Sequence, residues 1–179
     1  MKAEQATVNL HGMYRDVLRD RHGRVIWDRG WHKNVIVVDC RRLLAGFMRG
    51  APTTLGIQGL QVGQGLAAWD SPPGPPTPTP GQTALVDPAP HTEPVANLQI
   101  DYLDGGVVTA TPTHRVQIVA TLGPGVPAWP DGDHPTSTLR EFGLFGELDG
   151  AEVLINYVIH PAIVKDPAST LERTIRLVF

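Results

Sequence analysis

The sequence predicts a mostly β fold: an antiparallel β-sandwich or barrel-like domain with one short α-helix and long proline-rich loops. Apolar and polar residues alternate over several segments, most regularly at the end of the chain, where every second position is held by Leu171, Arg173, Ile175, Leu177 and Phe179. Turn residues, rather than helical stretches, connect consecutive strand-like segments. The 19 glycines and 17 prolines among 179 residues are typical of a chain with many turns and loops.

The first strand-like segments are predicted to form a β-hairpin. Thr7 to Leu18 has the pattern of a strand, Asp20 to Gly23 supplies turn residues, and Val25 to Trp27 starts a second strand. Asn34 to Val38 follows as a short β-branched run. Further strands are predicted over Ile57–Val62, Leu98–Tyr102, Val107–Val108, Val116–Leu122, Leu139–Phe145, Val153–Ile163 and Leu171–Phe179.

One helix is predicted, roughly from Asp39 to Arg49. Apolar residues recur there at helical spacing (Leu43, Leu44, Phe47 and Met48), and core packing is the expected role of this stripe. Asp39 is a candidate N-terminal cap because its carboxylate can accept backbone N–H groups, and Gly50 stands where a C-terminal cap belongs.

We expect a single β-rich domain over residues 1–179 with two long loops. The first is a proline-rich insertion at about 66–95, and the second is a proline- and glycine-rich loop at about 123–136. Proline fixes φ and lacks an N–H donor, so the Pro72 to Pro80 tract is predicted to be an extended surface segment. A loop of this length inside one domain is usually functional or disordered.

Composition argues against several classes of partner. The net charge is −3, with 15 basic and 18 acidic residues, so there is no basic excess to neutralise nucleic acid. No apolar run approaches the ~20 residues that span a bilayer, and the amino terminus lacks a signal-peptide core. Cys40 is the only cysteine, which excludes an intramolecular disulfide and fits a protein kept in the cytoplasm.

No pattern in the sequence predicts a catalytic, cofactor or metal site. The seven histidines form no His-x-x-x-His or Glu-x-x-His pair. Gly63-Gln64-Gly65 lacks the third glycine of a nucleotide-binding turn, and Asp131-Gly132-Asp133 lacks the glutamate of a calcium loop. Cys40 has no histidine partner by pattern. We therefore expect a non-enzymatic protein with no cofactor and no metal.

Several motifs, taken in order, resemble those of small structural proteins of tailed bacteriophages and of phage-tail-like contractile injection systems. They are Trp31-His32-Lys33-Asn34-Val35-Ile36 before the helix, Leu60-Gln61-Val62-Gly63-Gln64-Gly65 after it, Thr83-Ala84-Leu85, Leu139-Arg140-Glu141-Phe142-Gly143-Leu144-Phe145-Gly146, and Ile163-Val164-Lys165-Asp166 before the last strand. The resemblance covers most of the chain except the proline tract. It implies a homo-oligomeric, non-enzymatic component of a baseplate, collar, fibre attachment site or capsid surface, made in the bacterial host cytoplasm and incorporated into a virion or tail-like particle.

Five residues are candidates for contacts with such neighbours: Trp31, Trp69, Trp129, Arg140 and Glu141. The charges of Arg140 and Glu141 suit either intersubunit pairs or a solvated sheet edge. The alternative function is a ligand- or carbohydrate-binding β-sandwich module. In that case Trp69 and Trp129, both in proline-rich loops, would stack on the sugar rings of a surface glycan.

Overall fold

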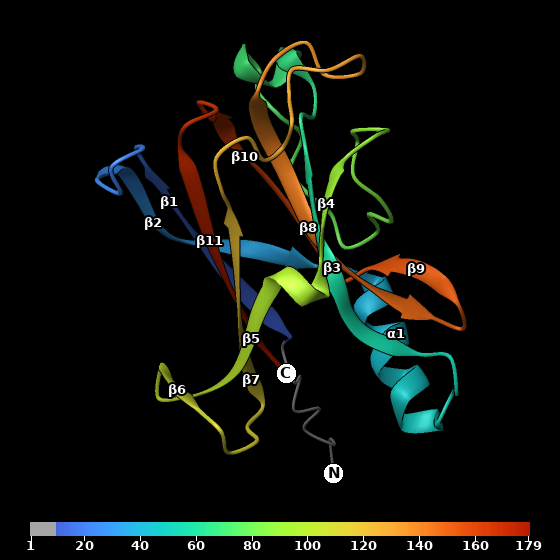
Figure 1. Ribbon diagram of the computed structural model, residues 1–179. Helices are drawn as coiled ribbons and strands as arrows, with labels where there is room; N and C mark the ends of the chain where they lie inside the picture. Colours follow the sequence, from blue (N-terminus) through green and yellow to red (C-terminus); the bar gives the residue numbers. More distant parts are fainter. Residues whose placement is uncertain (1–9) are drawn as a thin grey trace.

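The computed structural model describes residues 10–179 and is mostly β, with one α-helix and long loops (Figure 1). The strand that the sequence predicts from Thr7 therefore begins outside the described residues. In chain order the elements are β1 (His11–Arg19), β2 (Val25–Ile36), α1 (Val38–Arg49), β3 (Leu55–Gly63), η1 (Ala67–Asp70), β4 (His91–Pro94), η2 (Val95–Asn97), β5 (Leu98–Asp104), β6 (Val107–Thr109), β7 (Arg115–Leu122), β8 (Thr138–Leu148), β9 (Ala151–Leu154), β10 (Asn156–Val164) and β11 (Thr170–Val178).

The strands form one antiparallel sheet system that bends back on itself. Its order is β4-β3-β8-β10-β2-β1-β11-β7-β5-β6, and β9 pairs with β8. β2 joins the two halves because it pairs with β1 along most of its length and with β10 through Val35 and Ile36. The resulting β-sandwich or barrel-like arrangement confirms the fold class that alternation and turn residues predict.

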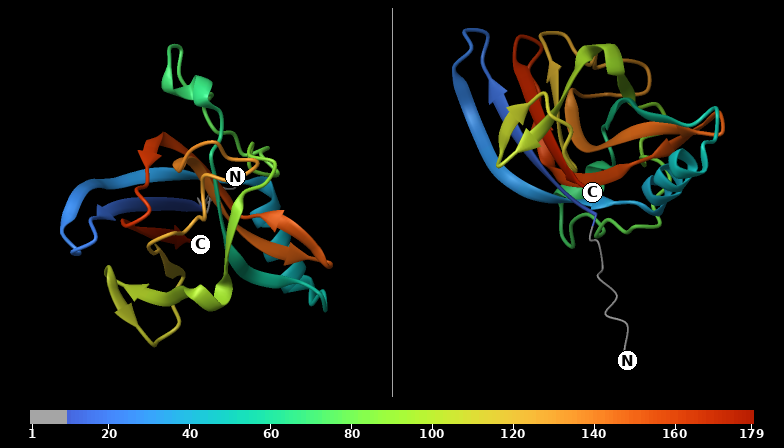
Figure 2. Two further views of the ribbon diagram at one scale, coloured as in Figure 1. Left: turned by 45° about the horizontal axis from the view of Figure 1, so that its top comes forward. Right: turned by 90° about the horizontal axis from the view of Figure 1, so that it is seen from below.

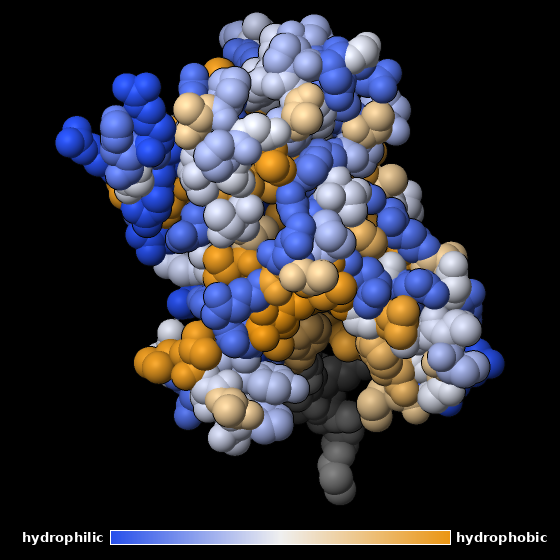
Figure 3. All heavy atoms as spheres, viewed as in Figure 1, coloured by the Kyte–Doolittle hydropathy of each residue, from blue (hydrophilic) through white to orange (hydrophobic). Residues whose placement is uncertain are grey.

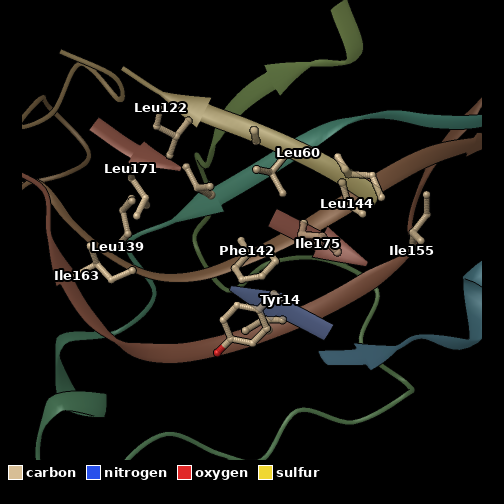
Figure 4. Packing of buried hydrophobic residues seen from close by; sticks show 14 of the residues in the cluster. Tyr14, Leu60, Leu122, Leu139, Phe142, Leu144, Ile155, Ile163, Leu171 and Ile175 are labelled. Atoms are coloured by element: carbon tan, nitrogen blue, oxygen red, sulfur yellow. The ribbon is translucent and has the colours of Figure 1, made fainter. Parts of the chain in front are cut away.

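The hydrophobic core lies between the two halves of the sheet (Figure 4). Leu60 of β3 and Phe142 of β8 come from one half, whereas Tyr14 of β1, Leu122 of β7 and Ile175 of β11 come from the other. Along β11 every second side chain is buried, as the alternation predicts. The end of the described chain is thus held between β1 and β7.

The predicted hairpin forms, but its second strand is longer than the sequence pattern indicates. Asp20 accepts hydrogen bonds from the N–H groups of His22 and Arg24, and Gly23 has a φ of 78°, as the turn requires. The segment from Val25 and the run that begins at Asn34 belong to one continuous strand, β2. The two segments form one strand because both pair with β1, on either side of a shift in register between Arg15 and Val17.

The helix α1 confirms the predicted helix but corrects two of its details. Gly50 adopts the left-handed conformation at the C-terminus, and its N–H group and that of Ala51 satisfy helix carbonyls. Asp39 does not cap the N-terminus; its carboxylate accepts a hydrogen bond from Arg42 instead. Phe47 and Met48, at the end of the predicted core stripe, are 44% and 90% exposed because only one narrow side of α1 packs on the sheet.

β8 is buried along most of its length because it lies between β3 and β10 with side chains packed on both faces. Glycine is required where other backbone comes close. A Cβ at Gly143 would lie 2.6 Å from the carbonyl oxygen of Asn156, and one at Gly146 would lie 2.7 Å from that of Gly56. The glycines of the Arg140 to Gly146 motif therefore serve close packing.

The proline-rich loop is more structured than the sequence predicts. It contains the 3-10 turn η1 and the short strand β4, which pairs with β3. Its first part, around η1, projects from the body of the molecule (Figure 2). Its later part returns along the sheet, so the loop meets the β-core at both ends.

Candidate functional site

Glu141 holds the proline-rich loop against β8. Its carboxylate is fully buried and accepts hydrogen bonds from the N–H groups of Val86 (3.0 Å) and Asp87 (2.7 Å) and from the hydroxyl of Tyr157. Burial, together with this hydrogen bond, raises the pKa of the Tyr157 hydroxyl, so the tyrosine remains the donor. Glu141 is thus an internal anchor for a loop that lies more than fifty residues away in sequence.

Asp87 and His134 link the two long loops to each other. The Nε2 atom of His134 lies 3.2 Å from Asp87, and Nδ1 lies 2.8 Å from Asp131. Burial lowers the pKa of His134, but the two flanking carboxylates outweigh it and raise the pKa overall. Trp129 stacks on the imidazole with ring centroids 3.9 Å apart. The carboxylate of Asp87 also accepts the N–H of Gln64 at the end of β3.

These contacts change the expected role of three candidate interface residues. Trp129, Arg140 and Glu141 are all buried by the protein's own loops, so they are not part of the surface that the sequence analysis expected a neighbour or a sugar to touch. Arg140 and Glu141 were misjudged because β8 is covered on both faces, whereas charges beside a strand more often face solvent; Trp129 is buried because its ring stacks on His134. Trp31 and Trp69 remain half-buried. Trp31 lies on the outer face of the sheet under the guanidinium of Arg176, 4.4 Å from its ring centroid.

A bulge in β10 creates a pocket beside Trp69. Ile159 pairs with Glu141 and Ile163 pairs with Leu139, so four residue steps on β10 face two on β8. The bulge contains Pro161 and Ala162. The guanidinium of Arg29 in β2 donates hydrogen bonds to their carbonyl oxygens, at 2.8 and 3.1 Å. We call the resulting cavity of about 390 Å³ the bulge pocket; it is lined by Trp69, Asp70 and Pro75 from the proline-rich loop and by Ile159–Ala162 from β10.

The loop side of the bulge pocket is held by Arg140, which projects from β8 beside the bulge. Its guanidinium donates to both carboxylate oxygens of Asp70, at 2.7 and 3.0 Å, and to the carbonyl of Gln64 at 2.9 Å. The ring of Trp69 lies directly against Gly65, where a Cβ would come within 2.3 Å of it. The bidentate pair and this close contact place Trp69 and Asp70 in defined positions.

A buried polar cluster lies beneath the pocket. Asp16 and Arg173 form a fully buried bidentate ion pair, with distances of 2.7 and 2.8 Å. Arg173 also packs over the ring of Phe142 and donates to Nε2 of His160, 3.1 Å away. Burial, reinforced by the charge of Arg173, lowers the pKa of His160 to about 3, so its imidazole is neutral at ordinary pH. Arg173 occupies an inward position of the alternating last strand, which was the only sequence signal for this cluster.

A second candidate surface lies where residues 10–179 leave part of the inner face of the sheet exposed. Ile100 and Tyr102 continue the core-facing row of β5, yet each is 39% exposed. Val107 of the edge strand β6 pairs with Asp104 and therefore lies on the same face as Tyr102, whereas Val108 pairs with Leu103 on the other face. Val95 of η2, just before β5, is also exposed. We call Ile100, Tyr102, Val107 and Val95 the apolar end; apolar side chains gather over β5 and β6 in the space-filling view (Figure 3).

Three further observations concern metal ligands, the single thiol and the helices of residues 10–179. No three or more His, Cys, Asp or Glu side chains in this part of the chain are grouped to hold a metal ion. Burial raises the pKa of the Cys40 thiol to about 11, which keeps it protonated near neutral pH. None of the helices in the described part has the length and apolar character to cross a membrane.

Comparisons of the chain with protein-family models, with curated proteins and with solved structures gave no match.

Proposed function

We propose that the chain is a non-enzymatic structural subunit of a phage or phage-tail-like particle, which assembles with copies of itself and with other particle proteins. The proposal unites the motif resemblance of the sequence with one structural observation, the apolar end. Side chains that belong to the inner face of a sheet are normally covered, and a contiguous exposed apolar patch on a protein surface commonly marks an interaction site.

The edge of the sheet strengthens this interpretation. β6 pairs with β5 on one side and has no strand beside its other side in residues 10–179. A free edge presents unpaired N–H and C=O groups that a strand of a neighbour can bond. Val107 lies on this edge, so one partner can pair with the edge and cover the side chains of the apolar end at the same time.

Self-association through this surface is tested by a charge substitution with a matched control. Val107 and Val164 are both strand valines that are 71% exposed, but only Val107 belongs to the apolar end. We expect light scattering after gel filtration to show an oligomer for the wild type and for Val164→Lys, and a smaller species for Val107→Lys. A wild type that stays monomeric up to its solubility limit would refute self-association.

The particle role is tested separately. We expect mass spectrometry of purified particles from the producing cells to detect the chain in fixed stoichiometry with other particle proteins. Its absence from such particles, with the chain present in the same lysate, would contradict the proposed role whatever its oligomeric state.

A further inference from the structure

The bulge pocket holds an aromatic ring that is fixed in place before any ligand arrives. Trp69 is half-buried and lies against the backbone of Gly65, so its indole is held by the loop and not free to rotate into solvent. A fixed, amphipathic aromatic surface binds a flat apolar face of a ligand with little loss of conformational entropy. The pocket volume of about 390 Å³ lies within the range of sites for small molecules.

The pocket also holds a hydrogen-bond acceptor with spare capacity. Arg140 uses one edge of the Asp70 carboxylate through its two parallel N–H groups. An ionised carboxylate has about four lone-pair directions, so roughly two remain for hydroxyl donors. The Asp70 side chain is 42% exposed and lines the pocket, so a ligand in the pocket can reach its carboxylate.

The lining of the pocket carries no unbalanced charge. The negative charge of Asp70 is paired with Arg140, and His160 is held neutral by its burial next to Arg173. A cationic ligand would have to compete with Arg140 for Asp70, and an anionic ligand would meet a carboxylate without a free cation in the lining. The ring of Trp69, the acceptor Asp70 and the balanced charges of the lining together favour a neutral ligand with a flat apolar face and several hydroxyl donors.

We propose that the bulge pocket binds a neutral sugar unit of a glycan, with Trp69 stacking on the sugar ring and Asp70 accepting hydrogen bonds from its hydroxyl groups. The bulge pocket and the apolar end have no residue in common. Sugar binding can therefore be tested independently of self-association. Only one of the two tryptophans that the sequence suggested takes part, because Trp129 is buried against His134.

The test uses the full chain and soluble probes of each charge class. The neutral probes are hexasaccharides of glucose, N-acetylglucosamine, galactose and mannose; choline is the cationic probe and an oligogalacturonate is the anionic probe. Saturation-transfer NMR detects binding, and isothermal titration calorimetry measures the affinity. We expect at least one neutral oligosaccharide to bind and neither charged probe to do so.

Variants assign binding to the pocket. We expect Trp69→Ala to weaken binding by about ten-fold or more, and Trp69→Phe to retain much of it because a stacking ring remains. Trp31→Ala is the control, since Trp31 lies on the outer face of the sheet and should leave affinity unchanged. If Trp69→Ala fails to fold, Ala162→Leu fills the pocket without removing the platform and should weaken binding similarly.

Three results would overturn the proposal. They are no saturation transfer to any neutral oligosaccharide at millimolar concentration, binding of choline or oligogalacturonate in their place, or neutral-sugar binding that survives both Trp69→Ala and Ala162→Leu.

Discussion

The buried ion pair of Asp16 and Arg173 makes a quantitative test of how the core tolerates charge. Both side chains are fully buried, and two hydrogen bonds join them. Replacing Arg173 with Met leaves an aspartate without its partner in the core, and removing one member of a buried pair costs about 3–5 kcal/mol. That loss is a large part of the roughly 5–15 kcal/mol that stabilises a typical domain.

Urea denaturation measures the effect. With an m-value of about 2 kcal/mol/M, the midpoint of Arg173→Met should fall by roughly 2 M. The double variant Asp16→Leu/Arg173→Met removes both charges and should recover most of the loss, within about 2 kcal/mol of the wild type. Burial raises the pKa of Asp16, but Arg173 outweighs it and lowers the pKa overall. Without Arg173 the pKa rises, so the deficit of the single variant should shrink as the pH falls and Asp16 is protonated.

The matched control lies one residue away on β1. Arg15 pairs with Asp28 in the same bidentate manner, but both side chains are a third or more exposed. Because water screens such a pair, Arg15→Met should lower the urea midpoint far less than Arg173→Met does. The reasoning is wrong if Arg173→Met costs no more than Arg15→Met, or if the double variant is as unstable as Arg173→Met alone.

Three further perturbations test other parts of the fold. Gly143→Ala should destabilise the protein by about 1–3 kcal/mol because the added methyl meets backbone, whereas Gly132→Ala, with nothing within 4 Å, should be nearly neutral in the same urea assay. The pKa of His160 is about 3 when folded and near 6.5 when unfolded, so the unfolded state binds the extra proton between these values. Wild-type stability should therefore fall by up to about 1.4 kcal/mol per pH unit below pH 6.5, and His160→Gln should flatten this slope; an unchanged slope would contradict a neutral buried imidazole. Deleting residues 175–179 removes the inward side chains at the end of β11 and should abolish cooperative thermal unfolding, so a deleted chain that still melts cooperatively would show that the last strand is dispensable.

Most of the secondary structure was predictable because its signals are local. The turn after Asp20, the helix end at Gly50 and the hairpin turn at Gly105 and Gly106 all use residues whose backbone preferences mark the turn. The misjudged details depend on packing. Asp39 bonds to a side chain instead of capping the helix, and Met48 is exposed because α1 buries only a narrow strip of its surface.

The candidate sites were harder to predict because they join segments that are distant in sequence. Trp69 was identified as a candidate, but nothing in the sequence pattern indicated that a bulge in β10 would form the opposite wall of its pocket. Asp87 and His134 stood in loops without any recognisable spacing, and only folding places them 3.2 Å apart. Pairing between remote residues has no periodic signature in a single chain.

By itself, the sequence determined which residues share a face of each strand, where the chain turns, and that the last strand is held in a sheet. Alternation of apolar and polar residues reveals this because every second side chain of a strand points to the same face. Only the tertiary structure decided what covers each face. The bend of the sheet at β2 and the return of the proline-rich loop bury Arg140, Glu141 and Trp129, while leaving the apolar end and Trp69 accessible.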